Sequence, residues 1–230
     1  MTTAPAAAPA APDLHDYRVI HHCIRIAPHR MAAALAELEA GDLDRARALA
    51  RYWVGYAGEV LAHHTVEDEV FFPRLVERVP VVAEHLVRVD ADHHRLDQLM
   101  EAGGAAMERL AASASLAAAN DAGAILRELA RHMDDHLDFE DEDLVPLFGR
   151  HFTASEYEEL TEAAVKGLSI KQAAFTVPFV MHWASPADRA KMLGEAPLPM
   201  RVIYRLTRGR HARLTALALG RAAAPQEVLV

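Results

Sequence analysis

The sequence has one cysteine and no long hydrophobic run, and each shortage excludes a class of protein. A lone cysteine, Cys23, cannot form an internal disulfide, which is typical of the reducing cytosol. No segment approaches the ~18 consecutive apolar residues of a membrane-spanning helix. Residues 1–12 lack the basic start and leucine-rich stretch of a secretory signal, and their Ala/Pro composition predicts a disordered tail. We therefore expect a cytoplasmic protein without a membrane span.

Lysine is absent from residues 1–150, where 14 arginines face 26 acidic residues and the net charge is −12. Residues 151–230 instead carry a net charge of +3. The acidic balance of the first part argues against a nucleic-acid-binding protein, and the change of sign suggests a domain boundary near residue 150. Glycine and aromatic residues are few, whereas Ala, Leu, Val, Glu and Arg dominate. This composition predicts an all-α fold.

A motif rich in histidine and acidic residues occurs twice in the acidic part. Residues 63–73 read HHTVEDEVFFP and residues 136–146 read HLDFEDEDLVP, so both follow H-x-x-x-E-D-E-x, two apolar residues and proline. In each copy the histidine and the first glutamate are four residues apart, which places them one turn apart on one face of a helix. The two pairs are His63 with Glu67 and His136 with Glu140.

The first pair lies where its helix is expected to be apolar. Stepping by three and four residues from Trp53 through Tyr56 and Val60 leads to His63 and then to Glu67. A glutamate on a buried face costs several kcal/mol unless it is paired or bound to a cation. A repeated imidazole–carboxylate pair on a buried face therefore predicts a metal site.

Periodicity and turn residues predict four long helices joined by short loops. Such helices are typical of an antiparallel up-down-up-down four-helix bundle. Gly103 and Gly104 are expected to weaken the third helix. The expected helices cover about residues 13–40, 42–73, 80–112 and 121–146, with a small-residue loop at 113–120.

In such a bundle, inward residues at similar depth on all four helices meet. Four histidines and two glutamates are expected there, a set that would be hard to satisfy without metal. Imidazole and carboxylate ligands suit iron, zinc, copper or manganese. Because each glutamate can bridge two ions, two metals are favoured over one tetrahedral zinc. The predicted ligands are His21, His63, Glu67, His93, His136 and Glu140.

Further polar residues lie near this expected site. His132 is one turn before His136 on the same face, so it is the best candidate for an additional ligand. Three other histidines lie about 100° around their helices from an inward histidine, and we expect them to supply protons rather than bind metal. Asp68 is expected on a solvated acidic face. The three histidines are His22, His64 and His94.

Residues 151–230 are expected to form a smaller helical region. Thr153 and Glu156 make a capping-box pattern, Ser185 begins a second helix signal, and an apolar segment lies between them. The last helix, ending near Leu219, carries arginines and no acidic residue. We favour docking of this basic helix onto the acidic bundle, in the same or another subunit, over binding to an anionic surface or partner.

These motifs together resemble the hemerythrin-like, or HHE cation-binding, family, and the C-terminal part resembles the extension of its actinobacterial members. The resemblance covers residues 13–150 and implies a non-haem, oxygen-bridged di-iron centre. It rests on His21 with Arg25, HHTVE at 63–67, DHHRLD at 92–97 and HLDFE at 136–140. By the resemblance, His21 and His63 serve one iron, His93 and His136 the other, and Glu67 and Glu140 bridge.

The chain departs from the oxygen-carrying members at Val89. Those members have a histidine one turn before the position of His93, where this chain has valine. Their last histidine and carboxylate are also five residues apart, against four here. The missing imidazole opens one iron unless His132 or water replaces it, which favours redox chemistry or sensing over reversible oxygen storage.

Three functions follow from these features. The first is a di-iron protein that binds or turns over hydrogen peroxide, oxygen or nitric oxide, in stress defence or sensing, with catalase- or peroxidase-like activity as one form. The second is non-catalytic binding or storage of iron or oxygen. The third is an interaction module with a structural metal, whose basic C-terminal helix contacts a partner. Steady-state consumption of peroxide separates the first from the second.

Overall fold

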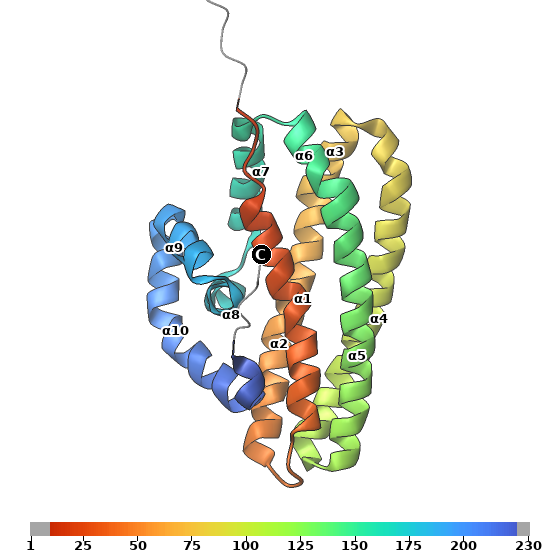
Figure 1. Cartoon of the computed structure of the whole chain (residues 1–230), viewed down its shortest axis with the longest axis vertical. Coiled ribbons are helices and arrows are strands. Elements are labelled where there is room, and N and C mark those ends of the chain that lie inside the picture. The colour runs from red at the N-terminus through yellow and green to blue at the C-terminus, as the bar shows by residue number, and fades with distance from the viewer. Residues whose placement is uncertain (1–9, 225–230) are drawn as a thin grey trace, which may run out of the picture.

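The computed structural model describes residues 10–224, and every regular element in that range is helical. Four long helices form the predicted antiparallel up-down-up-down bundle (Figure 1). None of the helices in this range has both the length and the hydropathy needed to cross a membrane. Most of the expected N-terminal tail, residues 1–9, lies outside the described residues. The bundle helices are α1 (His15–Ala36), α2 (Leu43–Val66), α4 (Ala83–Ser113) and α5 (Leu116–Phe139).

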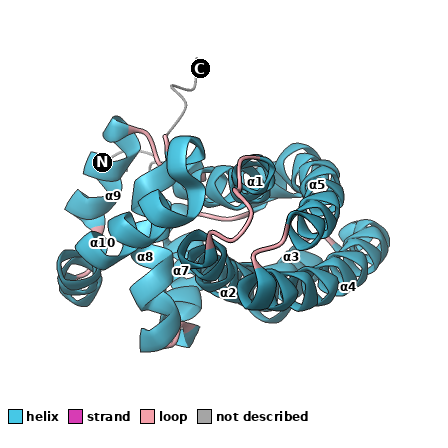
Figure 2. Cartoon of the chain, turned by 90° about the horizontal axis from the view of Figure 1, so that it is seen from below, coloured by secondary structure: helices cyan, strands magenta, loops and turns pink. Residues whose placement is uncertain are grey.

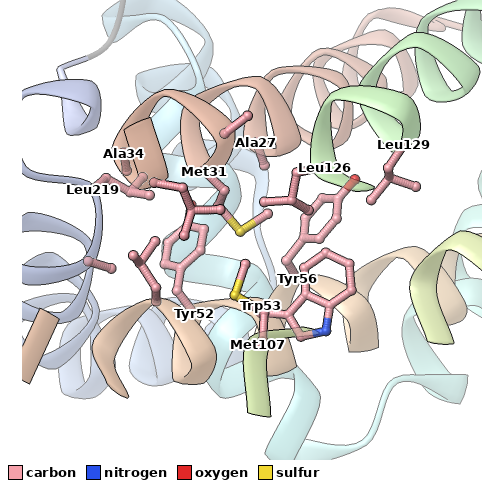
Figure 3. Packing of buried hydrophobic residues seen from close by; sticks show 14 of the residues in the cluster. Ala27, Met31, Ala34, Tyr52, Trp53, Tyr56, Met107, Leu126, Leu129 and Leu219 are labelled. Carbon is pink, nitrogen blue, oxygen red and sulfur yellow. The ribbon is translucent and has the colours of Figure 1, made fainter. Parts of the chain in front are cut away.

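The bundle helices enclose one interior, which is visible in the view from below (Figure 2). Helix α5 packs against α1 and α4, and α4 also packs against α2. Towards the lower end, aromatic side chains of α2 fill this interior together with Met31 and Leu126 (Figure 3). Tyr52, Trp53 and Tyr56 are all buried there. The lower half of the bundle is thus an apolar core, and the predicted ligands His63, Glu67, His136 and Glu140 lie at the other ends of α2 and α5, at the π-helical turns.

The predicted loop at 113–120 is wrong, because α5 begins at Leu116. Ala114 adopts a left-handed conformation with φ of 44°, and its carbonyl accepts a hydrogen bond from the Gly41 amide at 2.9 Å. The Ser115 hydroxyl caps α5 by accepting from the Ala118 amide at 3.2 Å. The alanines after Ser115 have high helix propensity, so a two-residue turn suffices.

The predicted helix ends at Pro73 and Pro146 are also wrong. A π-helical turn, Glu67–Phe71, continues α2 into α3 (Phe72–Arg78), with a 3₁₀ turn (Pro80–Val82) before α4. A second π-helical turn, Glu140–Leu144, continues α5 into α6 (Val145–His151). Proline cannot donate to the carbonyl four residues back and crowds it, so a widened turn before each proline lets the helix continue.

Gly103 and Gly104 do not interrupt α4, which runs unbroken to Ser113. Gly103 is buried against Trp53: a Cβ atom at Gly103 would lie 2.6 Å from ring carbons Cη2 and Cζ2. At Gly104 the nearest atom would be 3.6 Å away, which is an ordinary contact. The first glycine therefore makes room for an aromatic ring, and the second is not required by packing.

We expect Gly103→Ala to lower the free energy of unfolding by about 1–3 kcal/mol, because the buried ring cannot move away from the new methyl group. Gly104→Ala is the matched control and should stabilise the protein by about 0.5–1 kcal/mol, through helix propensity alone. Urea unfolding followed by circular dichroism measures both. Equal effects of the two substitutions would contradict the packing role of Gly103.

The C-terminal helices pack on one side of the bundle (Figure 1). Trp183 of α8 donates from its indole nitrogen to the Tyr52 hydroxyl at 3.0 Å, and Phe179 is fully buried in the same core. The basic helix α10 packs on α2, where the rings of His211 and Tyr52 lie 6.1 Å apart and Arg45 donates to the Ala218 carbonyl at 3.3 Å. The arginines of α10 itself are exposed and do not make this contact. The helices are α7 (Ala154–Gly167), α8 (Ile170–Trp183), α9 (Pro186–Glu195) and α10 (Leu198–Leu219), followed by a 3₁₀ turn (Gly220–Ala223).

Candidate metal centre

The predicted ligand residues come together between the four bundle helices. Helix α1 supplies one histidine, α4 another, and the motifs on α2 and α5 each supply a histidine and a glutamate. All of these side chains are at least nine-tenths buried. Each glutamate is the first residue of a π-helical turn, a feature frequent at functional sites. The assembled residues are His21, His63, Glu67, His93, His136 and Glu140.

Glu67 directs its two carboxylate oxygens towards different histidines. Oε1 lies 3.1 Å from Nε2 of His63 and 3.7 Å from Nε2 of His21. Oε2 lies 3.8 Å from Nε2 of His93, on the other side of the carboxylate. One carboxylate thus faces two separate groups of imidazoles.

Glu140 repeats this arrangement from the opposite helix. Its Oε2 atom lies 3.6 Å from Nε2 of His21, and its Oε1 atom lies 3.7 Å from Nε2 of His136. Ligand atoms about 2.1 Å from a shared metal are roughly 3.0–3.5 Å apart, close to these separations. Two overlapping groups of ligand atoms result, and both contain the two glutamates. One group adds His21 and His63, and the other adds His93 and His136.

His64 also belongs to this cluster, contrary to the prediction that it lies away from the interior. It is only 5% exposed, and its ring stacks on that of His93 with centroids 4.0 Å apart. His64, His93 and His136 offer three nitrogens that lie within 4.8 Å of one another. The interior direction of α2 falls between His63 and His64, so the first faces His21 and the second faces α4 and α5.

The ligand atoms of this cluster are buried without hydrogen-bond partners in the described part of the chain. They include Nε2 of every histidine in the cluster, Oε2 of Glu67 and both oxygens of Glu140. Buried polar atoms are normally hydrogen-bonded, and so many buried atoms without a partner would lower the stability of the fold considerably. A pair of cations between the carboxylates and imidazoles would satisfy them together. The residues present therefore fit a metal centre.

Aspartates that follow the two glutamates contact outer nitrogens of the histidines. Asp141 accepts a hydrogen bond from Nδ1 of His21 at 2.9 Å, and Asp68 lies 3.4 Å from Nδ1 of His93. Because a carboxylate only accepts, Asp141 keeps the proton of His21 on Nδ1 and leaves its Nε2 free for a metal. Asp68 is exposed, as predicted for a solvated acidic face. Arg25 pairs in turn with Asp141 at 3.4 Å.

The pKa values of the two glutamates are shifted in opposite directions by their neighbours. Burial and the neighbouring charge of Glu67 raise the pKa of Glu140 well above its usual range. Burial also opposes ionisation of Glu67, but His63 and His21 outweigh it and hold the pKa of Glu67 well below its usual range. Two adjacent carboxylates cannot both be ionised cheaply in a buried site without cations.

Two imidazoles of the cluster, His64 and His136, are held neutral. Burial lowers the pKa of His136 to about 3. Burial is also the main reason why the pKa of His64 lies well below its usual range. A neutral imidazole keeps a lone pair for coordination, so these side chains are suited to a metal rather than to an ion pair.

Tyr17 lies beside the cluster on the side of α1. Its hydroxyl donates to Oε1 of Glu67 at 2.5 Å, and its ring lies 4.6 Å from that of His21. Burial and the charge of Glu67 raise its pKa well above the usual range, so the phenol stays protonated.

The remaining sequence candidates lie outside the cluster. His132 is only partly buried and belongs to none of the groups that could hold a metal, whereas His64 belongs to one of them. His22 and His94 also lie outside the groups, as predicted. Val89 faces the interior and is 1% exposed, as its position one turn before His93 requires. The prediction missed His64 and Asp141. Each directly follows a predicted ligand in the sequence, in the dipeptides His63-His64 and Glu140-Asp141.

Comparison with protein families gives a match to the hemerythrin HHE cation binding domain over residues 14–148. Comparison with curated proteins and with solved structures found no match. The matched range covers more than half of the chain and contains all four bundle helices and the whole histidine–glutamate cluster. The chain is therefore a metal-binding protein that belongs to the hemerythrin HHE cation-binding domain family.

Proposed function

We propose that this protein holds two iron ions and uses them to bind or turn over a small oxidant. The observation that carries the proposal is the orientation of Glu67 and Glu140. In each glutamate, one carboxylate oxygen faces the imidazole group of His21 and the other oxygen faces the group of His93 and His136. That is the geometry of bridging carboxylates. Imidazole and carboxylate ligands suit iron, which would supply redox chemistry. The ligand class is hydrogen peroxide, oxygen or nitric oxide, and we propose a role in oxidative or nitrosative stress in the cytoplasm.

The proposed ligand sets of the two ions are unequal. Two groups share His93 and His136: one adds His64 and the other adds the two glutamates. Combined, they would give one ion five protein ligands, whereas His21 and His63 with the same glutamates would give the other ion four. His64 thus replaces the imidazole that is missing at Val89. The ion beside His21 and His63 has the greater open coordination. A small ligand is therefore expected to bind on the side of α1, where the Tyr17 hydroxyl lies.

Azide, nitric oxide and peroxide test this function. We expect azide and nitric oxide to change the optical spectrum of the iron-loaded protein, because one coordination position is open. Hydrogen peroxide should be consumed in the steady state if the protein is a catalase- or peroxidase-like enzyme, and it should only change the spectrum if it is a sensor. A di-iron protein inert to all three would support storage of iron instead.

Tyr17→Phe examines the same side of the centre. We expect it to retain both ions, because Tyr17 contacts a ligand and is not one, and to alter the rate of peroxide reaction through loss of the hydroxyl. Tyr56→Phe, a buried tyrosine of α2 in the apolar core, is the matched control. Stopped-flow spectroscopy and metal analysis give both readouts. Equal peroxide kinetics in the two variants would exclude a role of the Tyr17 hydroxyl.

A further inference from the structure

A cleft leads from the surface to the proposed open side of the centre. It has a volume of about 580 Å³ and lies between the bundle and the C-terminal helices α7 and α9. Its inner wall includes Tyr17 and His63, both of which belong to the proposed metal site. A second cavity of about 640 Å³ shares Ile20, Thr161 and Met192 with the first, so the space continues along the C-terminal helices.

The cleft is much larger than a diatomic molecule or hydrogen peroxide needs. A water molecule takes about 30 Å³ of liquid volume, and sites for small organic ligands span ~300–1,000 Å³. The walls are mainly apolar and include Ile20, Phe71, Ala164 and Met192. Size and lining together match the apolar body of an organic molecule.

The charges at the mouth select against anions. The ammonium group of Lys191 lies 2.7 Å from Asp13 and 3.7 Å from Asp16, so two carboxylates already neutralise it. Glu158 and Glu195 add two more carboxylates to the lining. Acidic charge exceeds basic charge there, and a fatty acid or another carboxylate would be repelled.

The inner end of the cleft offers a polar contact. The Tyr17 hydroxyl donates its proton to Glu67, which leaves the phenol oxygen able to accept a hydrogen bond from an incoming O–H group. His63 lies at the same end. A ligand with an apolar body and a neutral O–H head therefore fits the cleft with its head at the metal centre.

We propose that this cleft binds a neutral organic hydroperoxide, with its apolar body against α7 and α9 and its hydroperoxy group at Tyr17 and His63. This inference rests on the proposed oxidant-handling function, which it deepens by naming the class of oxidant. The C-terminal helices thereby form one wall of the ligand site. Their contribution is the α7 face that carries Thr161 and Ala164.

Calorimetric titration of the metal-loaded, full-length protein with cumyl alcohol tests the proposal. The alcohol has the body and O–H head of cumyl hydroperoxide without its oxidising bond. We expect saturable binding of one molecule per chain. The matched anion 2-methyl-2-phenylpropanoate should bind at least tenfold more weakly, because of the acidic mouth. Absence of saturable binding by the alcohol, or equal affinity for the anion, would overturn the proposal.

Substitutions that fill the cleft with a larger side chain test whether cumyl alcohol binds there. Ala164→Trp should weaken cumyl alcohol binding at least tenfold, whereas Ala163→Trp, on the exposed face of the same helix, should leave it unchanged. If circular dichroism shows that Ala164→Trp does not fold, the smaller substitution Thr161→Leu, which also fills part of the cleft, takes its place. Binding that survives a folded filler would place the ligand elsewhere and refute the proposal.

The azide titration separates this proposal from the proposed function. If azide changes the spectrum but cumyl alcohol does not bind, the organic ligand is refuted and the metal centre stands. If cumyl alcohol binds and the fillers abolish binding, the cleft is a ligand site even if azide has no effect. Addition of cumyl alcohol should also slow azide binding several-fold in the wild type and leave azide kinetics of the folded Ala164→Trp variant unchanged.

Discussion

Glu67→Ala and Glu140→Ala are each expected to lose at least half of the bound iron. Each glutamate directs an oxygen to both imidazole groups, so its removal takes one ligand from both ions. Either variant would keep a single carboxylate in a site that must neutralise the charge of two cations. Metal analysis by mass spectrometry, with the optical spectrum, measures the loss.

Glu69→Ala and Glu142→Ala are the matched controls for these substitutions. Both residues lie two positions after Glu67 or Glu140, in the same π-helical turns, and both are exposed. We expect these variants to retain all of the iron and the wild-type spectrum. Full iron content in Glu67→Ala or Glu140→Ala would show that the carboxylate in question does not bridge.

His64→Ala is expected to lose the ion that His93 and His136 share, and to retain at least part of the other. The proposed five-ligand set would fall to four, and a buried imidazole stack would be lost. Val89→His in the His64→Ala background should restore the second ion, because position 89 lies one turn before His93 on the interior face. Metal content and the spectrum of the double variant provide the readout.

The outcome of this rescue decides which residue supplies the additional imidazole. His94→Ala, an exposed histidine outside the ligand groups, is the control and should retain both ions. If His64→Ala keeps both ions while His132→Ala loses one, the structure-based assignment fails and the sequence-based candidate is restored. If both variants keep their iron, water completes the coordination instead.

The sequence predicted the bundle and six of the clustered side chains because these depend on helical periodicity. A four-residue spacing on an apolar face places two side chains together whatever the rest of the chain does, which is why His63 with Glu67 was recognised. His64 was missed because periodicity treats one face of a helix as a line. A site with two ions is wide enough for residues 100° apart, so neighbours such as His63 and His64 can both face it.

Other errors arose where residues that often end helices, such as proline and runs of small residues, did not end them here. Pro73 and Pro146 indicated helix ends, yet a π-helical turn before each proline lets the helix continue. Small residues after Ser113 indicated a loop, yet alanines favour helix once a single left-handed residue makes the turn. Asp141 was missed because it meets His21 across 120 residues of sequence, a contact that only the tertiary structure shows.

The packing of the C-terminal helices on the bundle also could not be predicted from hydrophobic periodicity. The change in charge suggested a boundary near residue 150, and the capping box that opens α7 was visible in the sequence. The contact of Trp183 with Tyr52 was not, because an apolar segment does not indicate which surface it covers. The same contact surface brings α7 and α9 beside Tyr17 and so forms the cleft.

The most direct test of the proposed two-ion centre is the metal content of freshly purified protein, measured per chain together with its optical and Mössbauer spectra. The arrangement of two shared carboxylates between two imidazole groups predicts about two iron ions per chain, magnetically coupled through the bridge. A single ion per chain, uncoupled iron, or stoichiometric zinc without iron would contradict it.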